Sequence, residues 1–498
     1  MTDAILVPEH APSPAERLLA WRRAWLTIDR NEQAVGFAAS HAGLVVIHLA
    51  FFLLMALCGM RLGGFLLATG ALSLIAVSPR HKLSILGLAS IGYLFLAPFG
   101  GEAVKDLPAA LMERFAIEGI SAKTIGLGAG LGFFVTAFVA LNLQARYRDT
   151  APARRPLVTL LVVFWALVAV AAANILPPWP QTLLWSFIAM FAVCFWYLAY
   201  AMADQKSKDP TPSALRIGIF RPIWGAPLTP VGKGVAYLRK FEAQNGHALA
   251  AVRLRALKLM LWTAILYWTE HLLAYFFHDL AGIPTLGEAL TAQTAGNAPE
   301  LATGWAVIVA EYFLNVIRLC IFGHMVVAIV RMAGFGIPRN SVRPLAARSL
   351  SEFWNRYFFY FKELLVDFFF YPAFLRWFKS NRKLRLAFAT FCAAGLGNFL
   401  FHFMKRIDLV ALEGFMGAIR ESASFALYCT ALVTGLVISQ LRNRKPQPQD
   451  GFLRYEVLPR INVGLFFCLL AIFGEITVPG TFEDRVSFFL SLFGVKAS

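Results

Sequence analysis

Long runs of apolar residues, separated by shorter polar segments, recur along the whole sequence. Several runs have about 20 residues, the length that an α-helix needs to cross the hydrocarbon core of a bilayer. This pattern predicts an all-α polytopic membrane protein with about eleven transmembrane helices. The predicted spans cover residues 36–58, 61–78, 83–99, 122–143, 156–176, 182–203, 259–280, 302–330, 384–404, 422–441 and 461–478.

The composition agrees with this prediction. Of the 498 residues, 58% are hydrophobic and only 15% are charged. A water-soluble globule with this composition exposes large apolar patches, so we exclude that class. The six cysteines lie inside apolar segments and form no CxxC or Cys/His ligand spacing. They therefore predict neither a disulfide framework nor a metal site.

The basic residues indicate an orientation in the membrane. Lys and Arg number 46 against 29 Asp and Glu, a net charge of +17. The loop 204–258 is rich in Lys and Arg, whereas the connection 281–301 contains neither. Because cytoplasmic loops carry the excess of basic residues, we expect loop 204–258 and the N-terminal segment 1–35 to lie in the cytoplasm. This bias explains the net charge without nucleic-acid binding.

Residues 36–498 form a single predicted membrane-embedded domain, since no internal repeat divides them. The first 30 residues show no short apolar core with a cleavage site, and we expect no cleavable signal peptide. Loop 204–258 contains the Pro- and Gly-rich stretch "RPIWGAPLTPVGKG" and then reads as a basic amphipathic helix. That helix either contacts anionic membrane lipids or takes part in binding a substrate.

Ionisable residues inside apolar spans need a partner or a function, because burying them in lipid costs free energy. His41 and His48 lie one heptad apart on one helix face, but no second helix offers matching ligands for a metal or haem. Glu270, His271 and His278 lie near the outer end of their span. An interfacial position explains them, and a substrate entrance is the alternative.

The span 302–330 carries a polar stripe. Glu311, Asn315 and Arg318 share one helix face, and His324 follows further along the same span. An ion pair between Glu311 and Arg318 is the structural interpretation.

Two polar residues share a face of the span 384–404. Asn398 and His402 are four residues apart, about one helical turn. An imidazole titrates near neutral pH and can accept a proton from a hydroxyl group, so His402 is the best candidate for a general base. A histidine that only packs in the core is the alternative.

The stretch "RSLSEFWNRYFFYFKELLVDFFFYP", residues 348–372, mixes aromatic residues with polar ones at irregular spacing. Pro372 is expected to end it. Such a segment is typical of a helix that lies in the interface or re-enters the membrane, and polar groups at that depth are tolerated where they line a cavity. We therefore expect this stretch to form a cavity wall.

The segment from Glu311 to about Asp408 resembles the membrane-bound O-acyltransferase (MBOAT) family. In that family a span leads into a Gly-Phe-x-x-Pro-x-Asn-x-x-x-Pro turn, a Ser-x-x-x-Phe-Trp-x-Arg segment and an aromatic ending with Asp and Pro. The matching residues are Gly334, Phe335, Pro338, Asn340, Pro344, Ser349, Phe353, Trp354, Arg356, Asp367 and Pro372.

The resemblance also points to His402, because the family's catalytic histidine lies in the next span and this is the only histidine there. Two positions depart from the family pattern. Phe358 replaces a frequent His or Asn, and "GLGNF" replaces a Gly-Leu-Trp-His-Gly signature, with Asn398 at the position of its histidine. The resemblance implies re-entrant or interfacial helices around a central tunnel, with residues 311–408 as the core.

The implied activity is the transfer of an acyl group, acetyl or another short one, from a thioester donor to a hydroxyl group. The resemblance implies acyl-CoA or an acyl carrier protein as the donor and an exported polysaccharide or another envelope molecule as the acceptor. It implies no bound cofactor. The protein would lie in a bacterial inner membrane among membrane lipids, with envelope-biosynthesis proteins as partners.

The resemblance and the polar pattern together give a set of predicted site residues. His402, Asn398 and Asn355 are the predicted catalytic residues, with an asparagine orienting the imidazole or stabilising an oxyanion. The predicted donor- and substrate-binding residues are Arg343, Arg348, Trp354, Arg356, Lys362, Asp367, Glu311, Arg318 and His324. Basic members of this set are suited to the phosphates of a donor or to lipid head groups.

Three alternatives remain open at the level of the sequence. A member of the same family can transfer a longer acyl group from acyl-CoA to a lipid or a secreted peptide. A transporter or flippase would use Glu311, Arg318 and His402 to relay protons or bind a polar substrate. A catalytically inactive assembly partner would explain Phe358 and the altered signature.

Overall fold

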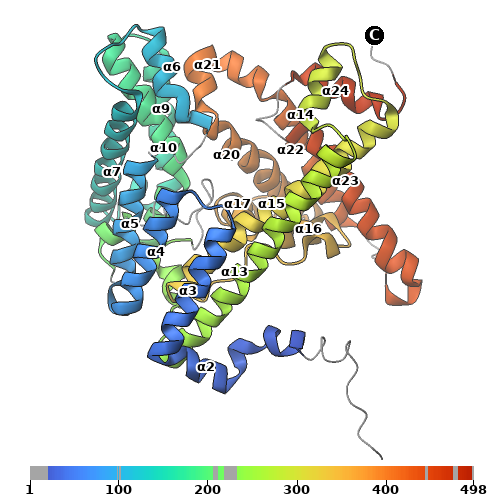
Figure 1. Cartoon of the computed structure of the whole chain (residues 1–498). Coiled ribbons are helices and arrows are strands. Elements are labelled where there is room, and N and C mark those ends of the chain that lie inside the picture. The colour runs from blue at the N-terminus through green and yellow to red at the C-terminus, as the bar shows by residue number, and fades with distance from the viewer. Residues whose placement is uncertain are drawn as a thin grey trace, which may run out of the picture.

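The computed structural model describes residues 21–97, 99, 103–205, 211–217, 233–442, 447–474 and 480–495. These residues form helices and no strand; one isolated β-bridge joins Glu242 to Phe335. The buried apolar side chains make three clusters, and α15 contributes to two of them. Figure 1 shows the arrangement of the helices. The prediction of an all-α fold is therefore confirmed for the described residues.

The first group of helices is built around α10, which is buried along nearly its whole length. It packs against α6, α7 and α9 and, from much later in the chain, α20 and α21. These helices are α6 (Leu107–Arg114), α7 (Ala122–Arg146), α9 (Pro156–Ala172), α10 (Pro178–Asp204), α20 (Asn398–Lys405) and α21 (Ile407–Glu421). The short helices α8 (Ala151–Arg154) and α11 (Ser213–Ile217) adjoin α9 and α7.

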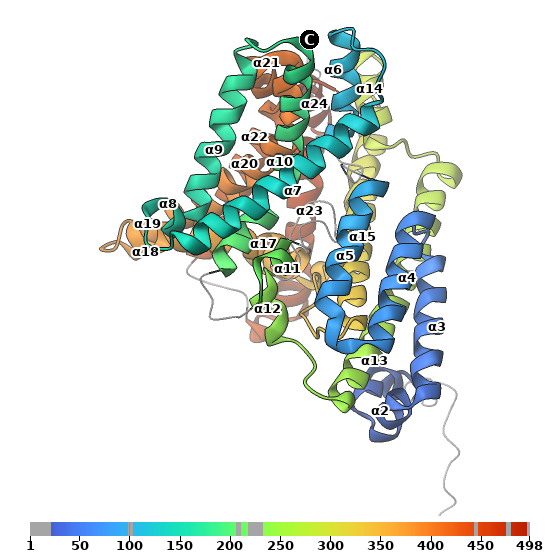
Figure 2. The ribbon, with the colours of Figure 1, turned by 90° about the vertical axis from the view of Figure 1, so that its left-hand side faces the viewer.

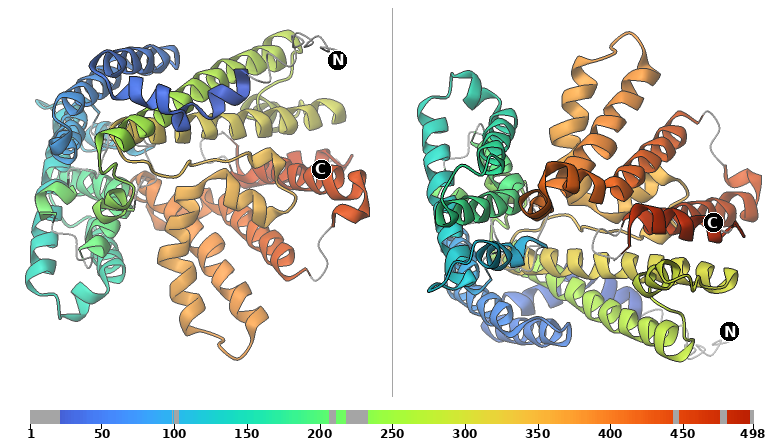
Figure 3. Two further views of the ribbon diagram at one scale, coloured as in Figure 1. Left: turned by 90° about the horizontal axis from the view of Figure 1, so that it is seen from below. Right: turned by 90° about the horizontal axis from the view of Figure 1, so that it is seen from above.

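The second group contains the N-terminal helices and the two longest ones. It comprises α2 (Glu32–Ala39), α3 (His41–Leu57), α4 (Leu62–Val77), α5 (Lys82–Leu96), α12 (Val235–Lys240), α13 (Gly246–Ala274) and α15 (Leu301–Met332). In Figure 2, α3, α4 and α13 lie to the right of α7, α9 and α10. Helices α13 and α15 run side by side, as both views of Figure 3 show. They connect the second group to the third, because α15 also packs against α14, α23 and α24.

The third group lies towards the C-terminus. It contains α14 (Leu286–Thr294), α16 (Leu350–Tyr357), α22 (Ala423–Leu441), α23 (Leu458–Gly474) and α24 (Phe482–Ser491) together with α15. Side-chain caps define several helix starts: Thr285 and Glu288 form a capping box at α14, and Ser349 accepts the backbone N–H of Glu352 at α16. These caps satisfy backbone donors that the first helical turn leaves unpaired.

Six helical segments of the described chain are long and apolar enough to cross a membrane. They are Ala122–Arg146, Pro178–Asp204, Leu301–Met332, Arg382–Lys405, Ile407–Leu441 and Leu453–Gly474. A seventh results if α2 and α3, which meet at 93°, count as one broken span. The protein is therefore an integral membrane protein.

The count of eleven spans stays a prediction. Each of the eleven predicted segments coincides with helical structure, but α4, α5 and α9 have only 16, 15 and 17 residues. A perpendicular span needs about 20 residues. The predicted basic helix of loop 204–258 and the span 259–280 are one continuous helix, α13, which begins where Asn245 caps it.

The aromatic stretch 348–372 is broken into four short helical pieces. These are α16, α17 (Phe359–Leu365), the π-helix η6 (Val366–Phe370) and α18 (Tyr371–Arg376). The expectation that Pro372 ends the stretch is wrong, because α18 continues for one turn beyond it. Proline fits at the start of a helix, where its missing N–H is not needed, and the preceding π-turn supplies such a start.

The turn between α15 and α16 is fixed to both neighbours. The Asn340 side chain accepts the backbone N–H of Tyr360 at 3.2 Å, and its carbonyl accepts that of Phe359 at 2.8 Å. Its amide nitrogen lies so close to Gly323 that a Cβ there would be only 2.3 Å away. These contacts hold α17 against α15, so the turn that resembles the MBOAT pattern positions the helices that follow it.

Candidate active site

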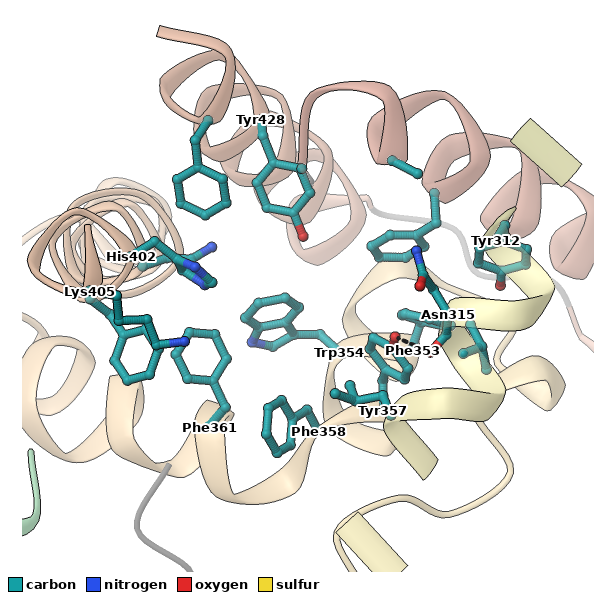
Figure 4. Close-up of a pocket in the computed structure, with 18 residues that line it drawn as sticks. Tyr312, Asn315, Phe353, Trp354, Tyr357, Phe358, Phe361, His402, Lys405 and Tyr428 are labelled. Carbon is teal, nitrogen blue, oxygen red and sulfur yellow. Dashed lines mark hydrogen bonds between the residues drawn. The ribbon is translucent and has the colours of Figure 1, made fainter. Parts of the chain in front are cut away.

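A cavity of about 450 Å³ lies where the first and third groups of helices meet (Figure 4). Its walls come from α15, α16, α17, α20, α22 and α23. The lining residues are Tyr312, Asn315, Val316, Leu319, Phe353, Trp354, Tyr357, Phe358, Phe361, Asn398, Phe401, His402, Lys405, Phe425, Tyr428, Phe467, Ala471 and Gly474. Five of them belong to the stretch 348–372, which confirms that this stretch forms a cavity wall.

His402 reaches the cavity from α20 and is surrounded by aromatic rings. Its ring centroid is 4.4 Å from that of Phe425, 5.3 Å from Phe401 and 6.0 Å from Phe361. Within the described part of the chain, neither imidazole nitrogen has a hydrogen-bond partner. A histidine held by ring packing alone keeps a nitrogen available for a substrate hydroxyl, as a general base requires.

Asn398 lies one turn before His402 on the same cavity wall. The residue is only 1% exposed, and its side-chain oxygen is buried without a hydrogen-bond partner in the described structure. Most buried polar atoms are paired, so an unpaired amide oxygen beside a cavity is the exception that requires an explanation. A bound molecule with a hydroxyl or amide group would satisfy it.

The helix that carries both residues begins with a π-helix, η7 (Phe391–Gly397). It packs against a second π-helix, η6, and the contact is close: a Cβ on Gly397 would lie 2.6 Å from the Phe369 ring. Single-turn π-segments inside α-helices are frequent at functional sites. Here the π-segment sets the rotation of α20 and thus the side of the helix that faces the cavity.

The opposite wall provides hydroxyl, amide and indole groups. Figure 4 shows Trp354 and Tyr428 pointing into the same space as His402. The Tyr357 hydroxyl donates a hydrogen bond of 3.4 Å to the backbone carbonyl of Asn315. Trp354 packs against the hydrophobic clusters of the first and third groups of helices. It therefore fixes the position of one cavity wall relative to the other.

The electrostatics of the cavity favour a neutral or negatively charged group. Lys405 lies one turn after His402, and its ammonium group is 4.6 Å from the centroid of the Phe401 ring. Among the described residues that line this cavity, none is Asp or Glu. The Lys405 ammonium would stabilise a negative charge that develops beside His402.

The predicted catalytic residues are therefore only partly brought together. His402 and Asn398 line the cavity, but Asn355 is exposed and lies outside it. Trp354 points inwards from α16, and the next residue is turned by about 100° along a helix, which directs Asn355 away. Asn355 is not placed to orient the imidazole.

Of the predicted donor-binding residues, only Trp354 lines the cavity. Arg356 pairs with Glu352 at 2.5 Å, and Arg348 lies 3.4 Å from Glu456. Arg343 is an exposed residue with a positive φ of 48° at the turn before α16.

Lys362 and Asp367 belong to a polar network beside α17. Lys362 contacts Glu363 at 2.6 Å, and Lys233 bridges Glu363 at 2.5 Å and Asp367 at 2.9 Å. The Tyr200 hydroxyl donates to Asp367 at 3.1 Å. This network ties the segment before α12 to α17 and η6, so its charges are satisfied within the protein.

The network shifts two pKa values outside the candidate spans. Burial opposes ionisation of Glu363, but hydrogen bonds from Lys233 and Lys362 outweigh it and lower the pKa of this carboxyl group. For Lys233, burial is likewise outweighed by hydrogen bonds to Glu363 and Asp367, which raise its pKa. Both shifts favour the charged forms.

Glu311, Arg318 and His324 lie outside the cavity. The nearest partner of Arg318 is Glu270 of α13 at 2.7 Å, and Glu311 is at 4.0 Å. His324 is buried, and its Nε2 atom lies 3.1 Å from the backbone carbonyl of Ser341, which anchors the turn after α15. Glu311 and Arg318 thus belong to an ion-pair cluster with Glu270, whereas the Nδ1 atom of His324 is buried without a hydrogen-bond partner among the described residues.

Of the other four histidines that the sequence singled out, three have polar contacts. His48 is buried and its Nδ1 atom contacts the Leu44 carbonyl at 2.8 Å, whereas His41 begins α3 and is exposed. His271 lies 3.0 Å from Glu270, and His278 contacts the Ile283 carbonyl at 2.8 Å. Among the described residues, no group of three or more His, Cys, Asp or Glu side chains is arranged to hold a metal ion.

Comparison with known proteins gives no match to a protein-family model and no curated protein of similar sequence.

Five polar lining residues were not among the predicted site residues: Tyr312, Asn315, Tyr357, Lys405 and Tyr428. Asn315 was assigned to the stripe of the span 302–330, but its position opposite His402 depends on how α15 and α20 pack. Lys405 lies three residues after His402, a spacing that places both on one face of a helix. Tyr428 comes from the span 422–441, which contains no Asp, Glu, Lys, Arg or His to draw attention to it.

Proposed function

We propose that the protein is a membrane-bound O-acyltransferase of the MBOAT type, with His402 as the general base. The observation that carries this proposal is the placement of His402 and Asn398 in one aromatic cavity, where neither the imidazole nor the amide oxygen has a partner among the described residues. The resemblance of residues 311–408 to the family supports the same histidine from a separate argument.

In the proposed reaction, a hydroxyl group of the acceptor lies beside His402 and the thioester carbonyl of the donor lies next to it. His402 takes the hydroxyl proton while the oxygen attacks the carbonyl carbon. The carbon–sulfur bond then breaks, and the departing thiolate takes the proton from the imidazolium. The reaction needs no covalent acyl-enzyme and no bound cofactor.

Two neighbours of His402 are suited to the transition state. The amide of Asn398 can orient the acceptor hydroxyl or donate a hydrogen bond to the oxyanion. The Lys405 ammonium stabilises the negative charge that develops in the transition state. A proton relay or a cation transporter would be expected to use carboxylates, and none of the described residues that line this cavity is Asp or Glu. The transporter alternative therefore has less support than acyl transfer.

The donor proposed is acyl-CoA or an acyl carrier protein, approaching from the cytoplasm through a tunnel formed within about eleven spans. The acceptor proposed is a hydroxyl group of an exported polysaccharide or another envelope molecule in a bacterial inner membrane. A cavity of about 450 Å³ lies near the lower end of the usual range for small-molecule sites, which favours a short acyl group.

The test is acyl transfer by the detergent-purified, full-length protein. Acetyl-CoA and longer acyl-CoAs, labelled in the acyl group, are offered with envelope polysaccharide, and both transfer and thioester hydrolysis are measured. We expect turnover with short chains that His402→Ala removes. The matched control is His271→Ala, because His271 lies outside the cavity and its side chain is 51% exposed. Equal turnover by wild type and His402→Ala would contradict the proposal.

A further inference from the structure

A second and larger cavity, of about 960 Å³, lies between α22 and α23 beside the start of α16. We call it the α22–α23 groove. Its apolar floor is formed by Leu350, Leu427, Ala431, Val463 and Phe466. It shares helices with the His402 cavity but no lining residue.

Close packing separates the two cavities. The rings of Phe353 and Phe467 lie 4.1 Å apart on the side of His402. On the other side, Phe466 and Leu350 approach Gly435 so closely that a Cβ there would lie 2.7 and 2.8 Å from them. The groove is thus a separate site.

The rim of the groove is positively charged. Arg348, Arg442 and Arg454 line it together with one acidic residue, Asp450. Arg348 faces Glu456 and the Tyr455 ring, at 3.4 Å and 4.1 Å. Arg442 and Arg454 have no carboxylate partner among the described residues, and both are exposed.

The groove also opens towards the apolar surface of the protein. It is bounded by two candidate membrane spans, Ile407–Leu441 and Leu453–Gly474. Ile438, which lines it, is 63% exposed, and its neighbour Leu458 is 43% exposed. Exposed apolar side chains on spans face lipid, while Arg442 directly follows the end of its span.

A molecule that fits this site has an apolar body and an anionic head. We propose that the α22–α23 groove binds an anionic phospholipid of the surrounding bilayer, with an acyl chain along Ala431 and the phosphate beside Arg442 and Arg454. Arginine pairs with phosphate through several N–H donors, and basic residues at the end of a span attract anionic lipids. A water-soluble phosphate compound would leave the apolar floor uncovered. The inference does not depend on the proposed acyl transfer.

The test is lipid binding to the full-length protein in non-ionic detergent, measured by native mass spectrometry. Phosphatidylglycerol, phosphatidylcholine and inorganic phosphate are the three probes. We expect phosphatidylglycerol to bind more tightly than either of the others. The double variant Arg442→Gln/Arg454→Gln should lower its affinity about 30-fold, because each basic group near the surface contributes about fivefold.

Two further variants control for charge and folding. Arg382→Gln/Lys383→Gln removes the same charge from the exposed start of α19 (Arg382–Thr390) and should leave lipid binding unchanged. Ala431→Trp fills the floor and should lower phosphatidylglycerol affinity without altering the arginines. If that variant does not fold, the arginine pair carries the test, since both side chains are exposed.

Three results would each overturn the proposal. The first is unchanged phosphatidylglycerol affinity in the arginine variant. The second is equal binding of phosphatidylcholine, which removes the role of the anionic head. The third is inorganic phosphate binding as tightly as phosphatidylglycerol, which removes the role of the apolar floor.

Discussion

The polar residues inside the helical bundle fall into two contrasting sets. Arg318 lies 2.7 Å from Glu270 and 4.0 Å from Glu311, so its charge is met within the protein. His402 and Asn398 lie in a cavity, and neither the imidazole nor the amide oxygen has a partner in the described chain. Paired groups are explained by the fold, whereas unpaired ones lower stability and are explained by a ligand or a reaction.

The contrast gives a rule for separating structure from function in this protein. Changes in the unpaired set should reduce activity and leave stability nearly unchanged. Changes in a paired set should reduce stability and leave the chemistry intact. Four predictions test this rule, beginning with the largest effect.

The largest effect is expected for His402→Gln, which keeps a polar side chain but removes the base. The rate of acyl transfer should fall about 10²- to 10⁴-fold, the usual contribution of a general base. The melting temperature should change little, because the ring makes no hydrogen bond within the described protein. Steady-state kinetics and thermal unfolding of the same preparations measure both. A large loss of stability would place His402 in the structural set.

The second effect concerns the network around Lys233. Lys233→Met leaves Glu363 and Asp367 without their shared cation and should lower the free energy of unfolding by about 2–3 kcal/mol. Activity per folded molecule should remain within about twofold if this network only ties the chain together. Thermal unfolding measures the change in the free energy of unfolding. The rate of acyl transfer divided by the concentration of folded protein measures the activity per molecule.

The pH dependence of the same network follows from its pKa shifts. The pKa of Glu363 is lowered, so its contribution is present above the ordinary value of 4.5 and is lost as the pH falls through the lowered pKa. The pKa of Lys233 is raised, so its contribution is present below 10.5 and is lost as the pH rises through the raised pKa. The difference in melting temperature between wild type and Lys233→Met should therefore be constant from about pH 5 to 10 and shrink on either side.

The third effect is expected for Asn398→Leu. The rate should fall about 10- to 100-fold, since a positioned amide is lost from the reacting groups. Stability should stay the same or rise by up to about 1 kcal/mol, because a buried oxygen without a partner is removed. Asn355→Leu is the matched control, because Asn355 is exposed outside the cavity and should affect neither quantity. A destabilised but fully active Asn398→Leu protein would contradict the assignment of Asn398 to the unpaired, functional set.

The smallest effect is expected for Glu270→Gln. Its carboxylate pairs with Arg318, whose side chain is 44% exposed and keeps Glu311 nearby. The free energy of unfolding should fall by only about 1 kcal/mol, with acyl transfer unchanged. Chemical unfolding measures the free energy of unfolding, and the assay with labelled acyl-CoA measures the rate of acyl transfer. Loss of transfer at normal stability would instead support the substrate-entrance interpretation of this region.

The sequence predicted the positions of the helices well, because an apolar run is a local property. Each of the eleven predicted segments overlaps a described helix, and six helical segments among them are long and apolar enough to span. Helix lengths were predicted less well. Helix α13 extends to Gly246 although its first half is basic, since Lys258 binds Asp29 and the Leu26 carbonyl from a distant segment.

The candidate site shows the same division between local and distant information. His402 and Asn398 were identified because their spacing within one helix defines a shared face. The ion-pair partner of Arg318 was not identified, because Glu270 is 48 residues away in the sequence and lies on another helix. The sequence analysis placed Asn355 in the site because residue types do not show which face of a helix points towards a cavity. Its neighbour Trp354 faces inwards and Asn355 does not.

The π-helix before α20 makes the position of Asn398 and His402 depend on the number of residues in that turn. In η7 the turn contains more residues than an α-helical turn, and the following helix starts at a correspondingly shifted angle. Deleting a single residue within Phe391–Gly397 would rotate Asn398 and His402 by about 100°. Both side chains would leave the cavity although every lining residue is still present. The number of residues in the helical turn before α20 is thus as necessary for the site as the imidazole itself.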